Sequence, residues 1–396
     1  MFADKYLEKS KRTALINSKP STSLGLIVVI PSYFEPEILT TLESLVECGQ
    51  PKSDVEVIIL INHSEKTSSE IKTFNHKTKL EIDNWRKERN SAKLCFYTIG
   101  PIEFQKKWAG AGLARKAGMD EAVYRFNLLR NTAGIIVSLD ADTLVEKNYL
   151  TEVENYFSKN PKQVGATISF QHQTKGLSKK HLEGIRLYEK YMGYYKKALE
   201  FTGYPYPMFT VGSAFAVTAG AYVKRGGMNR RQAGEDFYFL QNLAHQGTVG
   251  EINTTKVFPS ARLSDRVPFG TGPILQKWIN GEEDLTKTYN FEAFKVLKDF
   301  FDKKNFLFRI DETKFDTLLN KFPEPFQRFI KQDDFWLEVN DLNRNCSSLN
   351  SFQTRFFQKF DAFKILKFLN FSHEIYYPKV SLIEQIRLIE NYSPDN

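Results

Sequence analysis

The sequence predicts an α/β fold, with a Rossmann-like, mostly parallel sheet followed by an α-helical C-terminal extension. Between residues 25 and 172, short β-branched apolar runs alternate with amphipathic stretches. Strands that are buried on both faces and joined by crossover helices produce this alternation. Beyond residue 275 the chain contains 18 of its 33 Phe residues. They lie mostly three or four positions apart, as in amphipathic helices that bury a broad face.

The individual elements follow from these patterns. Apolar runs predict strands at 24–30, 55–61, 93–99 and 134–139, with helical patterns after each of them. The Tyr-rich segment 178–210 has a helical pattern, for which we considered two interpretations: an aromatic acceptor groove or a helix that covers the sheet. A short strand-like run and a helical stretch at 234–247 follow. We therefore expect a leader at 1–24, an α/β domain at 25–274 and a helical Phe- and Lys-rich region at 275–396.

Composition restricts the class of protein. The chain of 396 residues is 41% hydrophobic and 26% charged, which is typical of globular proteins, and no window is apolar enough to span a membrane. The N-terminal residues lack the apolar core of a secretory signal, so we expect a cytoplasmic protein. The three cysteines are far apart and are expected to be reduced.

The net charge of +8 is unevenly distributed. From residue 275 onward, 18 basic residues face 19 acidic ones, so the positive excess lies in the first 274 residues. This predicts a polyanionic ligand for that part of the chain. Because no basic run of five or more occurs, we expect no nucleic-acid partner. Peripheral contact with the inner face of a membrane through the C-terminal helices is an alternative to their packing on the α/β core, although their neutral charge counts against it.

Two pairs of carboxylates stand at predicted element ends. Asp140 and Asp142 follow the strand at 134–139, and in an extended strand end their side chains would point to one side. Two oxygen donors beyond the carboxyl end of a strand suit Mg²⁺ or Mn²⁺ and a diphosphate, whereas the alternative is a pair of helix-capping residues. Glu235 and Asp236 begin a helical stretch, where the helix dipole favours them or where one of them acts as a general base.

Four segments, in order, resemble the motifs of family 2 glycosyltransferases with the GT-A fold. VVIPSYFEPEIL resembles the family's VIPxYNExxxL opening, and GAGLARKAGMDEA resembles its GxxxARNxG segment. SLDADT resembles the DxD motif, and GGMNRRQAGEDF resembles the GG…ED segment. The resemblance covers roughly residues 25 to 250. It implies a hexosyltransferase-like enzyme (EC 2.4) that transfers a sugar from a nucleotide-diphosphate sugar to a carbohydrate or lipid-linked acceptor, with inversion.

The resemblance also implies roles for single residues. Asp236 is the expected base, with Glu235 beside it as a second catalytic residue. Mn²⁺ or Mg²⁺ is expected on Asp140 and Asp142, with Asp265 as a further candidate ligand. Nucleotide-sugar binding is expected of Pro31, Tyr33, Glu35, Asn62, Arg115, Lys116, Asp140 and Ala141.

Some segments depart from the family pattern. Asn62 stands where an Asp often contacts the base, and no His follows between 246 and 274 as a later metal ligand. Arg262, Arg266 and the loop at 270–272 fit either a phosphate-facing lid or a turn into the C-terminal region.

Three other classes compete with this interpretation. A dinucleotide-dependent oxidoreductase requires GxGxxG directly after the first strand, where this chain has PSYFEPE. A sugar nucleotidyltransferase would show a Gly-rich basic loop there. A degenerate nucleotide-sugar-binding module would lack a carboxylate of the site, but Asp140, Asp142 and Asp236 are all present.

Overall fold

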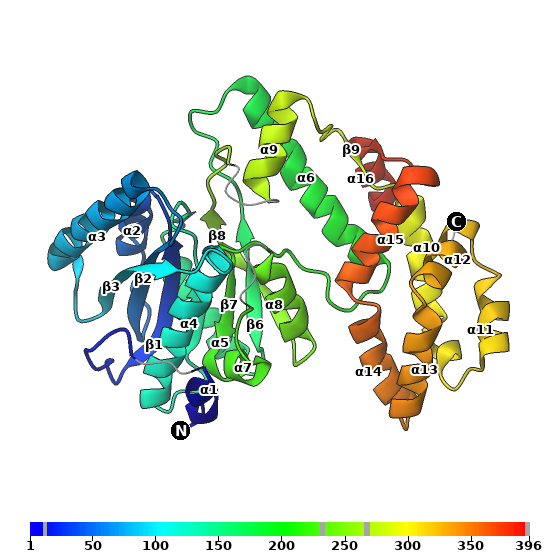
Figure 1. The fold of residues 1–396 in the computed structure, drawn as a ribbon, viewed down its shortest axis with the longest axis horizontal. Helices are drawn as coiled ribbons and strands as arrows, with labels where there is room; N and C mark the ends of the chain where they lie inside the picture. The colour runs from blue at the N-terminus through cyan, green and yellow to red at the C-terminus, as the bar shows by residue number, and fades with distance from the viewer. Residues whose placement is uncertain (11–13, 230–233, 265–269, 393–396) are drawn as a thin grey trace. The chain divides into compact units, whose positions relative to one another are not determined.

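The computed structural model describes residues 1–10, 14–229, 234–264 and 270–392. The chain forms two compact units (Figure 1). The α/β unit comprises Met1–Leu177 and Thr210–Gln276, and the helical unit comprises Ser178–Phe209 and Lys277–Asn396. The Tyr-rich segment therefore belongs with the C-terminal helices. The predicted domain at 25–274 is the part of the chain expected to carry catalysis, and this assignment stays a prediction.

The α/β unit is built on a curled sheet. Among the described residues, eight strands pair in the order β3-β2-β1-β4-β7-β6-β8-β5. β3, β2, β1 and β4 run parallel, as do β6 and β8, whereas β7 and β5 are antiparallel to their neighbours. The predicted α/β fold with a mostly parallel sheet and a helical C-terminal region is thereby confirmed. The strands are β1 (Leu24–Ser32), β2 (Asp54–Ser64), β3 (Leu94–Phe104), β4 (Ile135–Ser138), β5 (Leu144–Val145), β6 (Gly165–Phe170), β7 (Phe215–Thr218) and β8 (Val249–Phe258).

Helices cover both faces of this sheet, as the alternation of side chains along β1 shows. Leu26, Val28 and Ile30 lie in one core cluster with apolar residues of α2, α3 and α5. Val29 points to the other face, where α4 passes so closely that a Cβ on Gly118 would lie 2.5 Å from its Cγ1. The helices of this unit are α1 (Asp4–Lys9), α2 (Ile38–Val46), α3 (Ser69–Arg89), α4 (Ala111–Leu128), α5 (Tyr149–Lys159), α7 (Ala219–Arg225) and α8 (Glu235–Ala244); α9 (Thr271–Asn280) extends into the helical unit.

The N-terminal residues are packed against α4. The Tyr6 hydroxyl donates to Asp120 Oδ1 at 2.6 Å and accepts a hydrogen bond of 2.9 Å from Lys116 Nζ. The Tyr222 hydroxyl of α7 donates to the same Asp120 oxygen at 3.0 Å. The backbone N–H of Ala3 donates to Asn127 Oδ1 at 2.9 Å. This part of the predicted leader therefore satisfies buried polar groups of α4, the helix that also carries Arg115.

The helical unit has its own aromatic core. Phe300 has ring contacts with Phe326, Phe335, Phe356 and Phe360, at centroid distances of 4.8 to 6.1 Å. None of the described helices combines the length and the apolar character needed to cross a bilayer. The elements of this unit are α6 (Lys179–Phe201), β9 (Lys287–Thr288), α10 (Phe291–Asp302), the 3₁₀ helix Lys304–Leu307, α11 (Glu312–Leu319), α12 (Glu324–Gln332), α13 (Phe335–Asn345), α14 (Leu349–Lys359), α15 (Ala362–Ile375), β10 (Val380–Ser381) and α16 (Leu382–Glu390).

The packing of the N-terminal segment on α4 can be tested with Tyr6→Phe. This substitution removes a hydroxyl that hydrogen-bonds both Lys116 and Asp120 in a part-buried site, so we expect the free energy of unfolding to fall by about 1–2 kcal/mol. Urea unfolding followed by tryptophan fluorescence measures it. An unchanged midpoint would contradict a supporting role for the N-terminal segment.

Candidate active site

The candidate site lies where strands of the parallel half of the sheet end. Glu35 follows β1, and Asp140 and Asp142 follow β4. The strand ends at Ser138 rather than at 139, and the backbone N–H of Thr143 donates to the Asp140 carbonyl at 3.1 Å, which closes a turn. The two aspartates are thus presented by a turn, not by the extended strand end that the sequence suggested. The charge of Asp140 nevertheless acts on Asp142, so both lie in one electrostatic environment.

Neighbouring segments hold this turn in place. Ala141 is buried, and its carbonyl accepts a hydrogen bond of 3.0 Å from the Thr41 hydroxyl of α2. The Gln173 side chain donates to the Asp142 carbonyl at 2.9 Å and to the Phe258 carbonyl of β8 at 2.7 Å. The backbone of the turn is therefore tied to α2 on one side and to β8 on the other.

Arg115 of α4 joins two carboxylates from different elements. Its side chain is 3% exposed, its Nη2 donates to Asp140 Oδ1 at 2.5 Å, and its Nη1 donates to Glu235 Oε1. Although burial alone would lower it, the charges of Asp140 and Glu235 raise the pKa of Arg115 above its ordinary value. Arg115 thus remains a cation that fixes the start of α8 beside the turn after β4.

A close backbone approach leaves room for this guanidinium. A Cβ added to Gly212 would lie 2.8 Å from Arg115 Nη2. The Gly212 carbonyl accepts a hydrogen bond of 2.6 Å from the Ser138 hydroxyl at the end of β4. Any larger residue at position 212 would displace the arginine.

Arg262 makes a second bridge, between Glu35 and Asp142. Its Nη1 donates to Glu35 Oε1 at 2.7 Å, and its Nη2 donates to Glu35 Oε2 and lies 2.9 Å from Asp142 Oδ2. The charges of Asp142 and Glu35 and the hydrogen bond to Glu35 raise the pKa of Arg262, against the lowering effect of burial. Residues from the segments after β1, β4 and β8 are thereby brought to one place.

Asp236 completes the group from the first turn of α8. Gly234 adopts a left-handed conformation (φ 69°), which glycine tolerates best, and the helix begins immediately after it. Burial and the neighbouring Glu235 raise the pKa of Asp236 to about 7, although Arg115 opposes the shift. Its Oδ1 accepts a hydrogen bond of 2.8 Å from the Phe237 N–H.

Negative charge exceeds positive charge in this group. We use the name acidic cluster for the carboxylates of Glu35, Asp140, Asp142, Glu235 and Asp236. Within the described part of the chain, they surround the guanidinium groups of Arg115 and Arg262. Burial, together with the charges of Asp140 and Glu35, raises the pKa of Asp142 to about 7, even though Arg262 is bound to it. The cluster therefore favours an additional cation.

Four of the predicted nucleotide-binding residues, Pro31, Tyr33, Glu35 and Asn62, lie near the ends of β1 and β2. Pro31 belongs to β1, and Asn62 is buried near the end of β2. Asn75 of α3, which the sequence did not single out, donates to the Asn62 carbonyl at 3.2 Å and accepts from the Phe34 N–H at 2.9 Å. It therefore fixes the loop that carries Tyr33 against β2.

Lys116 is a predicted site residue that the structure does not bring to the cluster. The Lys116 ammonium lies 3.0 Å from Asp120 Oδ2, on the side of α4 that faces Tyr6. We therefore leave Lys116 out of the proposed site. Asp265, the candidate further metal ligand, and Arg266 lie outside the described residues.

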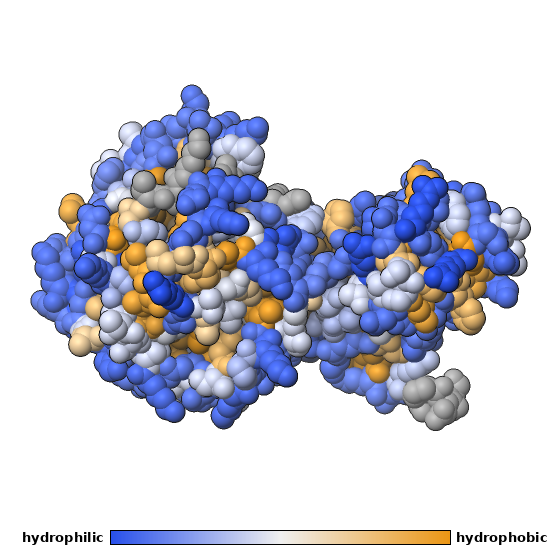
Figure 2. Space-filling model, turned by 90° about the horizontal axis from the view of Figure 1, so that it is seen from below, coloured by the Kyte–Doolittle hydropathy of each residue, from blue (hydrophilic) through white to orange (hydrophobic). Residues whose placement is uncertain are grey.

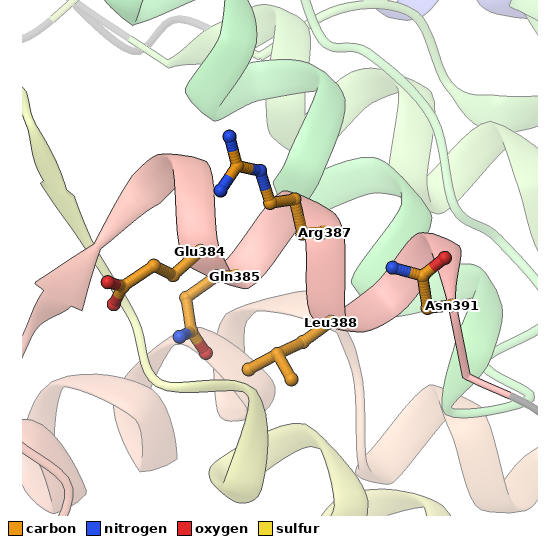
Figure 3. Close-up of a pocket in the computed structure, with 5 residues that line it drawn as sticks. All are labelled: Glu384, Gln385, Arg387, Leu388 and Asn391. Atoms are coloured by element: carbon orange, nitrogen blue, oxygen red, sulfur yellow. The ribbon is translucent and has the colours of Figure 1, made fainter.

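Neither the surface hollow described below nor the arrangement of metal-binding side chains gives a second candidate active site among the residues that the structure describes. No group of three or more His, Cys, Asp or Glu side chains is arranged to hold a metal ion within those ranges. A shallow surface hollow of about 380 Å³ lies beside α16 in the helical unit, lined by Glu384, Gln385, Arg387, Leu388 and Asn391 (Figure 3). These residues all belong to α16 or, in the case of Asn391, follow it directly. They do not bring catalytic side chains together at one point.

Residues 27–221 match the family model for glycosyl transferase family 2. This segment, which includes Glu35, Arg115, Asp140 and Asp142, is thereby identified as a family 2 glycosyltransferase segment. The match and the α/β sheet confirm the GT-A fold that the resemblance implied. Glu235, Asp236 and Arg262 lie beyond the matched segment.

No curated protein sequence gives a significant match to the chain. The similar solved structures include residues 1–349 of S. aureus TarS in complex with UDP-GlcNAc, at 11% identity and a TM-score of 0.42, covering 85% of this chain and 92% of that one. They also include the mannosyltransferase PcManGT from Pyrobaculum calidifontis in complex with GDP-Man and Mn²⁺, at 14% identity and a TM-score of 0.41, covering 98% of this chain and 93% of that one. The class of protein is therefore assigned from the family match.

The bridge made by Arg115 can be tested with Glu235→Gln. Because the substitution removes one carboxylate from a buried pair while Arg115 keeps Asp140, we expect the free energy of unfolding to fall by about 1–3 kcal/mol. Lys93→Gln is the matched control, since it breaks the more exposed pair with Asp54 in the same unit, and it should cost less than about 0.5 kcal/mol. Equal midpoints for the two variants in urea unfolding would contradict the structural importance of this bridge.

Proposed function

We propose that the protein transfers a hexosyl group from a nucleotide-diphosphate sugar to a hydroxyl of a carbohydrate or lipid-linked acceptor, with inversion at the anomeric carbon. The main support is the arrangement of Asp236, Asp140 and Asp142, which come from distant parts of the chain and belong to one group around Arg115 and Arg262. The family 2 match supports the same reaction class.

Asp236 is the proposed general base. Its pKa, raised to about 7, suits a group that must take a proton near neutral pH. Glu235 is less suited, because its carboxylate is buried and bound to Arg115. The Asp236 carboxylate takes the proton of the acceptor hydroxyl while that oxygen attacks the anomeric carbon. The bond from this carbon to the diphosphate oxygen breaks, and the nucleoside diphosphate leaves with the bonding electrons from the opposite face.

Asp140 and Asp142 are the proposed holders of a divalent metal ion. The fit rests on the donor set: two carboxylates on one turn, in a cluster whose negative charge the two arginines do not balance. Mn²⁺ or Mg²⁺ bound there would supply positive charge that offsets the charge of the departing diphosphate. Arg115 keeps Asp140 and the first turn of α8 in a fixed relation, so that the base and the donor site stay aligned.

The remaining roles at the donor site are proposals of the same kind. Pro31, Tyr33 and Asn62 lie at or just beyond the ends of β1 and β2, where α/β sheets bind nucleotides. Ala141 lies between the two aspartates of the turn. A cytoplasmic location and membrane contact through the C-terminal helices stay predictions. Exposed apolar residues of the helical unit include Phe306 and Leu337. On the face seen in Figure 2, hydrophobic residues form separate patches among hydrophilic ones.

The test of the proposed function is a panel of nucleotide sugars with Mn²⁺ and mixed acceptors, read by product mass. We expect one donor to add the mass of one hexosyl residue to an acceptor. Asp236→Asn should bind that donor normally but lower kcat by about 10²–10⁴-fold, because only the proton acceptor is lost. Donor binding without transfer would favour a binding module, and pyrophosphate release from a nucleoside triphosphate and a sugar phosphate would favour a nucleotidyltransferase.

The pH dependence of the reaction tests the base separately. Asp236 must be deprotonated to act, and its pKa is raised from 3.8 to about 7. We therefore expect kcat/KM, measured at saturating Mn²⁺, to fall tenfold per pH unit below about 7 and to level off above it. In Asp236→Asn the residual rate should lose this step. A wild-type profile that stays flat down to pH 5 would exclude Asp236 as the base.

A further inference from the structure

Arg262 holds its two acidic partners unequally. Both of its terminal nitrogens bind Glu35, which is 3% exposed, whereas the contact of 2.9 Å with Asp142 is made by Nη2, which also binds Glu35. Two-point pairing between a guanidinium and a carboxylate is stronger and more directional than a single shared contact. The Asp142 contact is therefore the one that can be given up while Arg262 stays anchored on Glu35.

The environment of Arg262 differs from that of Arg115. The Arg262 side chain is 33% exposed and that of Asp142 is 21% exposed, whereas Arg115 is 3% exposed and is bound to the buried Glu235. Separating Arg262 from Asp142 leaves a carboxylate that is still 21% exposed and that a bound cation can neutralise. Separating Arg115 from its partners would leave the buried Glu235 without its counter-charge. Only the Arg262 bridge is suited to exchange.

The carboxylate that Arg262 covers is one of the two proposed metal ligands. A guanidinium and a divalent cation that use the same carboxylate repel each other, and the repulsion is strong in a part-buried site. We propose that Arg262 is an exchangeable counter-ion: it neutralises Asp142 when no metal is bound and releases it when a divalent cation binds. This inference rests on the metal site of the proposed function.

Exchange would also couple the metal to the donor. Anchored on Glu35, the released guanidinium remains beside the metal ligands, and the N–H of Nη2 that no longer faces Asp142 can donate to a phosphate oxygen. The metal would thus prepare the arginine for the diphosphate, and by linkage a bound nucleoside diphosphate would tighten metal binding.

The experiment measures Mn²⁺ affinity without nucleotide, by electron paramagnetic resonance of free Mn²⁺, for the full-length chain. Loss of the competing charge in Arg262→Gln should tighten Mn²⁺ binding about tenfold. Arg262→Lys, whose single ammonium cannot hold both carboxylates, should shift the affinity in the same direction by about threefold. Lys93→Gln, which removes a positive charge from a more exposed pair in the same unit, should leave the affinity unchanged, and thermal unfolding checks that each variant is folded.

The outcomes separate this inference from the metal site itself. Tighter binding in both Arg262 variants supports exchange, and Arg262→Lys alone decides if Arg262→Gln does not fold. Equal or weaker binding in folded Arg262 variants, with binding lost in Asp142→Asn, overturns exchange and leaves the metal site intact. If neither the wild type nor any variant binds Mn²⁺, both the exchange and the proposed metal site are wrong.

Discussion

Crowding of negative charge at the ends of parallel strands is the constraint on which the rest of this site depends. Five carboxylates gather around two guanidinium groups, and the pKa values of Asp142 and Asp236 rise to about 7 as a result of burial and of their neighbours. Such an arrangement costs stability unless the scaffold holds it. The apolar packing of β1 and β4 supplies that rigidity, because their side chains are buried on both faces of the sheet.

Arg115 and Arg262 bind different carboxylates of the acidic cluster. Arg115 sits in a fully enclosed position that requires the bare backbone of Gly212 and the support of α4. α4 in turn is held by the N-terminal segment through Tyr6 and Asp120. Arg262 lies closer to solvent than Arg115 and contacts Asp142. Rigidity therefore belongs to the inner bridge, and the capacity to respond to a ligand belongs to the outer one.

The helical unit is stabilised by aromatic packing around Phe300 and by a buried lysine with its acidic partners. Its core is a set of interlocking Phe rings centred on Phe300, and its buried Lys364 is paired with Asp333 and Glu338. The Tyr residues of α6 take part in this packing: Tyr194 contacts Phe294 and donates its hydroxyl to the Tyr289 carbonyl at 2.9 Å. Neither interpretation made from the sequence included this arrangement, in which part of the Tyr-rich helix packs with C-terminal helices.

The sequence by itself determined the parallel strands, the helical C-terminal region and the acidic residues at element ends. It could do so because the spacing of apolar residues reflects the type of each element and the faces that it buries. It did not reveal β8, whose side chains are largely exposed or half-buried and therefore form no apolar run. Only the tertiary structure decided that Asp140 and Asp142 lie on a turn, that Arg115 faces the cluster while Lys116 turns to Asp120, and that Arg262 binds Glu35, 227 positions away. These pairings depend on which helix face packs beside which strand end, and the local sequence does not determine that packing.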